Sequence, residues 1–142
     1  MVSPLSPTLT FRVGAATYGC DISEAREIIP VRPTTRLPGA PAYVRGLINM
    51  RGTIVTVLDL GVRLDPSREQ IPEGEGSILL VRHRERMVGV VVDEVLDVRV
   101  LEIGDGDAAE SGGAIIRGVA TADGGAVVIL DLDALITQVL LS

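Results

Sequence analysis

The feature that most constrains this chain is an internal repeat. Residues 45–60 read RGLINMRGTIVTVLDL and residues 117–132 read RGVATADGGAVVILDL, so the pattern returns 72 positions later. Upstream, residues 18–28 resemble residues 88–98 at an offset of 70. The two halves therefore share one order of elements: hairpin, loop, Arg-Gly pair, apolar strand and Asp-Leu. A β-sheet unit of about 60 residues is marginal alone, so we expect the halves to share a core or to pack face to face.

The composition indicates a mainly β fold with an aliphatic core. Hydrophobic residues make up 46% of the 142 residues, but only Phe11, Tyr18 and Tyr43 are aromatic. Valine, isoleucine and leucine must therefore fill the core, and with 16 Gly and 8 Pro they favour strands joined by tight turns. We expect the all-β class, with a flexible N-terminal tail at residues 1–8, a linker at 65–77, and a short C-terminal helix at 131–141 capped by Asp131.

The charge of the chain argues against nucleic acid as a partner. The net charge is −6 and all 13 basic residues are arginine, whereas nucleic-acid binding needs clustered positive charge and stacking aromatic side chains. A small nucleic-acid-binding β-barrel is therefore only a remote alternative. No apolar run reaches the ~18 residues of a membrane span, and the N-terminus lacks a signal-peptide pattern. Because the single cysteine, Cys20, fits a reducing compartment, we expect a cytoplasmic protein without direct membrane insertion. We also expect the chain to be complete.

No group of residues in the sequence is arranged for catalysis. His83, the only histidine, stands in a charged turn where we expect it to be exposed, and Cys20 lies in an apolar strand, which predicts a buried, unreactive thiol. The paired carboxylates at 93–94 and 105–107 stand where strands end and are interpreted as caps or turn residues. The sequence has no phosphate-binding loop, and the Gly/Asp-rich segment 104–113 lacks the ligand spacing of a calcium loop. We therefore expect a protein that is not an enzyme and uses neither a metal nor a cofactor.

The two Arg-Gly pairs of residues 45–52 have different predicted roles. The pair at 45–46 recurs at 117–118, which indicates a role in the shared framework. Arg51 instead aligns with Asp123, so the framework does not require arginine at that position. An arginine beside a glycine turn can bind carboxylates or carbonyls in a two-point geometry. We therefore interpret Arg51 as a residue that recognises a partner.

Four motifs, in order along nearly the whole chain, resemble those of a known family. They are PAYVRGLINMRG at residues 41–52, IVTVLDL at 54–60, VGVVVDEVLDV at 88–98, and an opening formed by Tyr18-Gly19, Ile22, Ala25, Glu27, Ile28 and Val31. Their residues and spacing are similar to those of the CheW-like family of bacterial chemotaxis coupling proteins. The resemblance extends from about Leu9 to Leu135.

This resemblance implies both a fold and a function. CheW-like domains consist of two five-stranded, SH3-like β-barrels related by a pseudo-twofold axis, expected here at about residues 9–64 and 78–130. Free-standing members are non-catalytic cytoplasmic adaptors that couple chemoreceptors to the histidine kinase CheA in chemotaxis. The implied partners are the regulatory domain of CheA and the cytoplasmic tip of a chemoreceptor, within an array recruited to the membrane. The alternative is a coupling protein of a non-flagellar pathway, such as pilus or gliding motility.

The resemblance also implies a receptor-binding surface at the groove between the two barrels. By motif this surface includes Ala25, Gly46 and Arg51, with Ile22 and Ile28 close by. The expected mechanism is that an apolar groove buries one face of a receptor helix, while Arg51 supplies a polar contact that sets the register.

Overall fold

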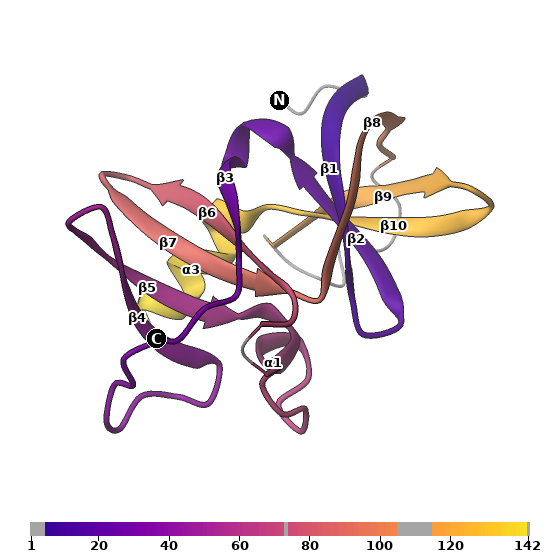
Figure 1. The fold of residues 1–142 in the computed structure, drawn as a ribbon. Helices are drawn as coiled ribbons and strands as arrows, with labels where there is room; N and C mark the ends of the chain where they lie inside the picture. Colours follow the sequence, from indigo (N-terminus) through magenta and orange to yellow (C-terminus); the bar gives the residue numbers. More distant parts are fainter. Residues whose placement is uncertain (1–4, 73, 105–114, 142) are drawn as a thin grey trace.

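In the computed structural model, the chain forms two five-stranded β-sheets and a C-terminal helix (Figure 1). The structure describes residues 5–72, 74–104 and 115–141. In chain order the elements are β1 (Leu5–Val13), β2 (Ala16–Asp21), the 3-10 turn η1 (Ile22–Glu24), β3 (Ala25–Pro30), β4 (Val44–Met50), β5 (Thr53–Asp59), α1 (Leu60–Leu64), β6 (Ser77–His83), β7 (Arg86–Val92), β8 (Glu94–Glu102), β9 (Ile116–Ala122), β10 (Gly125–Leu130) and α3 (Leu132–Leu141).

The two sheets have the same strand order once the repeat is taken into account. One sheet runs β8-β1-β2-β10-β9 and the other runs β3-β6-β7-β5-β4. In the repeat, β1 corresponds to β6, β2 to β7, β8 to β3, β9 to β4 and β10 to β5. Exchanging each strand for its counterpart converts the first order into the second. This is the relation expected of two units related by a pseudo-twofold axis. The predicted all-β class with two five-stranded units is confirmed.

Each sheet closes into a barrel through the segment that follows one of its edge strands. Beyond β3, Thr35 exchanges two backbone hydrogen bonds of 2.8 Å with Leu47 on β4, the opposite edge of the same sheet. Beyond β8, Gly104 makes the equivalent pair of bonds with Val119 on β9, at 3.0 and 2.9 Å. The unpaired backbone of β4 and β9 is satisfied at these points.

The barrels do not coincide with the two halves of the sequence. The barrel of β3–β7, here called barrel B, is one continuous segment from Ala25 to Val92. Barrel A combines β1 and β2 with β8, β9 and β10, and Figure 1 shows the two groups of strands on opposite sides of the molecule. The boundaries expected from the repeat, 9–64 and 78–130, differ from these because each repeat places its first hairpin in the barrel of the other repeat. The chain crosses between barrels at η1 and at Asp93.

A single apolar core lies between the barrels and joins both halves of the chain. It contains residues of both sheets, of α1 and of α3, all with less than a tenth of their surface exposed: Leu9, Phe11, Val13, Cys20, Leu58, Leu60, Leu79, Val81, Val88, Val90, Val92, Leu130, Leu132, Leu135, Ile136 and Val139. Because both halves supply residues to this core, burial of the core stabilises both barrels together. The expectation that the halves share a core is confirmed.

The two barrel interiors differ in size and polarity. Barrel B encloses seven buried aliphatic side chains, Val31, Ile48, Val55, Val57, Ile78, Leu80 and Val91. The interior of barrel A has a smaller apolar cluster of Leu101, Ala120, Val127 and Ile129. Two threonines of β1, Thr8 and Thr10, are also buried there, and Thr10 Oγ1 donates to Asp97 Oδ1 at 2.6 Å.

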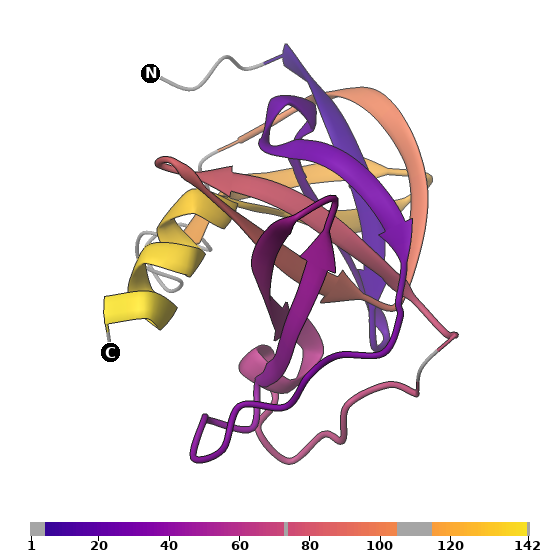
Figure 2. The same cartoon turned by 60° about the vertical axis from the view of Figure 1, so that its left-hand side comes forward.

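The C-terminal helix α3 lies against barrel B, as Figure 2 shows. Its cap is the predicted one, since Asp131 Oδ1 accepts a hydrogen bond from the backbone N–H of Ala134 at 3.0 Å. Among the described residues, no helix is both long and apolar enough to cross a membrane.

Two local expectations are wrong. Strand β1 begins at Leu5, inside the stretch predicted as a tail, because residues 5–12 pair along β8. His83 is buried, with 6% of its surface exposed, because it continues the alternation of Leu79 and Val81 toward the shared core. Its ring Nδ1 lies 2.7 Å from Asp133 Oδ1. Residues 1–4 of the predicted tail, and the carboxylates at 105–107 with the rest of the predicted loop to 113, lie outside the described residues.

Candidate partner-binding surface

Three of the predicted receptor-binding residues, Ile22, Ala25 and Ile28, lie on the segment that runs from η1 into β3. Asp21 caps η1, and its Oδ1 accepts a hydrogen bond from the N–H of Ser23 at 2.9 Å. This turn carries the chain from barrel A to barrel B. Ile22 and Ala25 pack against the shared core, whereas Ile28 is 43% exposed. The structure therefore separates two supporting residues from one surface residue.

The pairing of β3 with β6 determines the direction of these side chains. Ala25 pairs with Val81 and Ile28 pairs with Leu79, and both partners belong to the shared core. Paired residues of an antiparallel sheet project to the same face, and an irregularity between Ala25 and Glu27 keeps both residues on that face. Ile28 therefore extends the core-facing side of the sheet to its edge strand, where it becomes exposed.

Strand β8 carries a matching apolar strip that the sequence analysis missed. Val98 and Val100 alternate along the strand and are 54% and 66% exposed, whereas Leu96 lies at a register shift in the pairing with β1 and lines a hollow with Thr10 and Asp97. Val98 pairs with Leu9 of the shared core, so this strip also extends a core-facing side outward. The signal was present in the sequence, because the offset of 70 aligns Ile28 with Val98.

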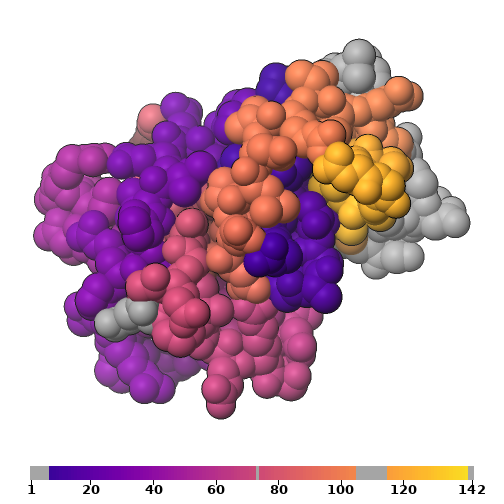
Figure 3. Space-filling model, turned by 45° about the vertical axis from the view of Figure 1, so that its right-hand side comes forward, coloured from indigo at the N-terminus to yellow at the C-terminus, as the bar shows by residue number. Residues whose placement is uncertain are grey.

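We call Ile28, Val98 and Val100 the apolar edge surface. Figures 1 and 3 show their strands, β3 and β8, on the same side of the molecule, beside the junction of the two barrels. These three are among the eight large hydrophobic residues that are exposed in the described part of the chain. Exposed apolar side chains gathered in this way mark surfaces that bind other proteins.

Arg51 lies in the turn between β4 and β5 and contacts β3. Its backbone has a φ of 52°, and its Nη2 donates to Glu27 Oε1 at 2.7 Å. The hydrogen bond from the guanidinium lowers the pKa of the Glu27 carboxyl. Because Glu27 pairs with Leu80 of the barrel B interior, Arg51 holds β3 from the face opposite to Ile28.

A pair of the same kind in barrel A changes the interpretation of Arg51. Asp123 occupies the turn between β9 and β10 with a φ of 53°, and its Oδ2 accepts a hydrogen bond from Arg99 Nη1 of β8 at 2.7 Å. Both turns thus contact the edge strand of their barrel through an ion pair, with the charges exchanged. Arg99 lies two residues beyond Asp97, the counterpart of Glu27. The framework therefore uses a charged residue at this turn in both halves, although it accepts either sign.

Gly46 occupies a position where two backbones approach closely. Its φ is 139°, and a Cβ atom there would lie 2.2 Å from the carbonyl oxygen of Thr35, whose segment closes barrel B. At Gly118 a Cβ atom would lie 2.1 Å from the carbonyl oxygen of Gly104, in the segment that closes barrel A. The glycine repeats because barrel closure leaves no space for a side chain. The structure thus places Gly46 beneath the Thr35 segment on β4, away from β3 and β8.

The arginines that precede these glycines have the framework role predicted from the repeat. Arg45 Nη1 lies 3.5 Å from Asp59 Oδ2 and donates to the carbonyl oxygen of Ile71 at 2.7 Å. Arg117 Nη2 lies 3.4 Å from Asp131 Oδ2. Since both aspartates also cap the helices that follow them, each Arg-Asp pair joins a strand to a helix start.

A partly buried carboxylate lies where η1 meets α3. Glu24 Oε2 accepts a hydrogen bond from the N–H of Asp133 at 3.1 Å, in the first turn of α3. Burial raises the pKa of Glu24 to about 7, against the opposing effects of that hydrogen bond and of Arg117. Burial likewise raises the pKa of the Cys20 thiol, as expected for an unreactive cysteine. Among the described residues, no three His, Cys, Asp or Glu side chains are arranged to hold a metal ion.

Proteins of known family are similar to this chain in sequence and in fold. Residues 7–140 match the family model of the CheW-like domain. The chemotaxis protein CheW of Rhizobium meliloti is 33% identical over 132 residues, which cover 88% of this chain and 83% of that protein. The chemotaxis protein CheW of Bacillus subtilis is 33% identical over 90 residues, or 63% of this chain and 57% of that protein. The protein PilI of Pseudomonas aeruginosa is 31% identical over 93 residues, or 63% of this chain and 49% of that protein.

The fold is also found among solved structures. The scaffolding protein TtCheW from Thermoanaerobacter tengcongensis matches with a TM-score of 0.80 at 24% identity, over 92% of each chain. That likeness shows the fold with its two subdomains, and the family model together with the Rhizobium meliloti relative shows the family. This chain belongs to the CheW-like domain family.

Proposed function

We propose that this chain is an adaptor that couples chemoreceptors to a CheA-type histidine kinase. The observation that carries the proposal is the apolar edge surface, on which three exposed aliphatic side chains from both barrels lie beside their junction. The helical cytoplasmic tip of a receptor is the proposed occupant. Membership of the CheW-like family supports this function, and several relatives carry the name chemotaxis protein CheW.

The apolar edge surface has the chemistry needed to bind one face of a helix. Ile28 comes from barrel B, and Val98 and Val100 come from barrel A. An amphipathic helix presents apolar side chains at spacings of three and four residues, so a helix lying along the junction would cover aliphatic groups from both barrels. Such contacts are individually weak, and repetition within an array multiplies their effect.

Arg51 acts in this proposal as a positioning residue. Its ion pair with Glu27 fixes the edge strand β3 next to Ile28. Ile22 and Ala25 support the same segment from the shared core. The five residues singled out by motif thus divide into one contact residue, Ile28, three that position β3, and Gly46, which allows barrel B to close.

The regulatory domain of the kinase is the second proposed partner. An adaptor that binds both proteins brings a receptor and a kinase into one assembly, and an array of such assemblies would recruit this chain from the cytoplasm to the membrane. In that assembly, receptor contacts that differ between signalling states would shift the conformation of the kinase.

A coupling protein of a non-flagellar motility pathway is the second candidate function. The similarity to PilI of Pseudomonas aeruginosa, whose name is not that of a chemotaxis protein, supports it. The two candidates use the same fold and differ in the kinase they engage. Binding of this chain to the purified regulatory domains of the CheA-type kinases encoded in the same genome would distinguish them.

Co-sedimentation with receptor-containing membranes tests the proposed receptor surface. The variants Ile28→Glu and Val98→Glu place a carboxylate in the apolar edge surface, and we expect each to reduce the bound fraction about tenfold or more. Leu37→Glu is the matched control, because Leu37 is an aliphatic residue of comparable exposure, 37% against 43% for Ile28, and lies outside both proposed binding surfaces. Binding of both edge variants at the level of the control would contradict the proposal.

A further inference from the structure

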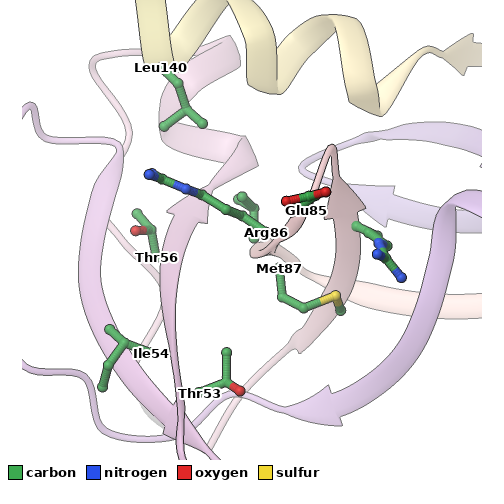
Figure 4. A pocket seen from close by; sticks show the side chains of 9 residues that line it. Thr53, Ile54, Thr56, Glu85, Arg86, Met87 and Leu140 are labelled. Carbon is green, nitrogen blue, oxygen red and sulfur yellow. The ribbon is translucent and has the colours of Figure 1, made fainter.

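A groove separate from the apolar edge surface lies between α3, β5 and the β6–β7 hairpin (Figure 4). Its volume is about 580 Å³, and its lining includes Ile54, Thr56, Arg86, Met87, Val88 and Leu140. A second hollow of about 420 Å³ shares Glu85, Arg86 and Leu140 with the first and continues along α3. We call the two together the basic groove. None of the residues that line it belongs to the apolar edge surface.

Apolar side chains form the walls of the basic groove. Ile54 on β5 is 60% exposed and Leu140 near the end of α3 is 43% exposed. The residues of α3 that belong to the shared core, Leu132, Leu135, Ile136 and Val139, are buried. Leu140 of the same helix is exposed. Both residues thus remain available for burial by a partner.

The rim of the basic groove carries three arginines without a carboxylate partner. Arg82, Arg84 and Arg86 are exposed and stand within five residues of the β6–β7 hairpin. In the part of the chain that the structure describes, none of them forms an ion pair, whereas six of the other ten arginines do. Figure 4 shows the side chain of Arg86 extending between Leu140 and Thr56. Glu85 of the same hairpin also lines both hollows, so three guanidiniums and one carboxylate leave the rim with a net positive charge in a chain of net charge −6.

The conformation of the hairpin turn indicates that one of these charges does not serve the fold. Arg84 has a φ of 58°, a left-handed conformation that side chains disfavour. The equivalent position of the β1–β2 hairpin is Gly14, with a φ of 61°. Glycine adopts this conformation without strain, so an arginine here keeps a positive charge at a cost in backbone energy.

We infer that the basic groove binds an acidic, amphipathic segment of a partner protein. Apolar side chains of that segment would pack on Ile54, Met87 and Leu140, and its carboxylates would pair with the guanidiniums of the rim. An anionic membrane surface fits less well, because the apolar residues line a concave groove and the chain as a whole carries negative charge. This inference is independent of the receptor surface proposed above.

Fluorescence anisotropy with two designed peptides tests the inference. One labelled peptide of about 16 residues has leucines along one helical face and glutamates beside them, and the matched peptide has lysines in place of the glutamates. We expect the full chain to bind the acidic peptide at least about tenfold more tightly than the basic one, with an affinity that falls as salt is added. Equal affinity for the two peptides, or no binding of the acidic peptide at about 1 mM, would overturn the inference.

Three variants and one vesicle assay complete the test. Arg86→Glu should weaken binding of the acidic peptide about tenfold or more, and Ile28→Glu should leave it unchanged, which separates this surface from the receptor surface. Arg84→Gly should weaken peptide binding while raising the melting temperature, a combination that a purely structural arginine would not give. Unchanged binding by Arg86→Glu and Arg84→Gly would overturn the inference. So would binding to phosphatidylglycerol vesicles in preference to the acidic peptide.

Discussion

The guanidinium of Arg51 and the carboxylate of Glu27 form an ion pair of 2.7 Å that joins the β4–β5 turn to the edge strand β3. Barrel A contains the pair Arg99–Asp123 at the same distance, with the arginine on the strand and the acid in the turn. Both turn residues have a positive φ, which directs the chain so that the turn meets the edge strand. What the two barrels share is therefore the ion pair, and the sign of each charge is free to change.

Exchanging the charges of Arg51 and Glu27 tests whether Arg51 positions β3 or contacts the receptor directly. Arg51→Glu places two carboxylates side by side, so we expect the fold to persist and receptor binding in the co-sedimentation assay to fall. The double variant Glu27→Arg/Arg51→Glu restores an ion pair of opposite polarity, as in barrel A, and should recover most of the binding. If the double variant binds no better than Arg51→Glu, the guanidinium itself contacts the receptor.

Substitution of Gly46 should act through stability. A Cβ atom at this position would lie 2.2 Å from the carbonyl oxygen of Thr35, so we expect Gly46→Ala to lower the free energy of unfolding by about 3–5 kcal/mol. Gly52→Ala is the control, because Gly52 also has a positive φ but has open space around its Cβ position. Its cost should be about 1–2 kcal/mol. Urea titrations that give equal midpoints for the two variants would contradict the close-approach argument.

The carboxylate of Glu24 should make stability depend on pH. Its folded-state pKa is about 7 against an ordinary value of 4.5, so folding takes up a proton between these values. The free energy of unfolding therefore falls as pH rises through this window. Glu24→Gln keeps an acceptor for the N–H of Asp133 but cannot ionise. The stability of the variant relative to the wild type should rise between pH 4.5 and about 7 and then stay level.

Urea unfolding of both proteins at several pH values measures this difference directly. His83, Asp131, Asp133 and Arg117, the charged or ionisable side chains near Glu24 and the start of α3, are the same in both proteins, so the difference between the proteins isolates the Glu24 carboxyl. Stability curves of the two proteins that run parallel from pH 5 to about 8 would contradict the raised pKa.

The shared core should make the two barrels unfold together. Phe11 is fully buried in the core between them, and Phe11→Ala should cost about 3–5 kcal/mol. Tyr18 lies on β2 of barrel A, and Tyr43 precedes β4 of barrel B. Variants that keep one tyrosine each should report the same unfolding midpoint by fluorescence, and separate midpoints would show that the barrels unfold independently.

Much of the fold could be predicted from the sequence, because the repeat and the alternation of apolar residues are local patterns. The pairing of strands is not local, and a repeat reveals which segments are equivalent without revealing which segments pair. The expected boundaries put β2 and β5 in the same barrel, whereas in the structure β2 pairs with β10 and β5 pairs with β7. The sequence therefore predicted two barrels correctly and assigned the first hairpin of each half to the wrong one.

The candidate site could be predicted only in part, for a similar reason. His83 stands among charged residues in the sequence, yet strand alternation directs its ring into the core. Val98 and Val100 look like the buried face of a half-exposed strand, and only the position of β8 at the sheet edge exposes them. Arg51 appeared unpaired because its partner, Glu27, is 24 residues away in sequence and becomes adjacent only after barrel B closes.

The exchange of hairpins has a consequence for how such a chain can arise. One repeat alone, residues 1–72, contains two strands of barrel A and three of barrel B, so it can complete neither barrel by itself. Two copies could complete both, each lending its first hairpin to the other. The present chain thus has the architecture of a domain-swapped dimer whose subunits have been fused through residues 65–76, and fragments cut in that segment should reassemble as complementary subunits.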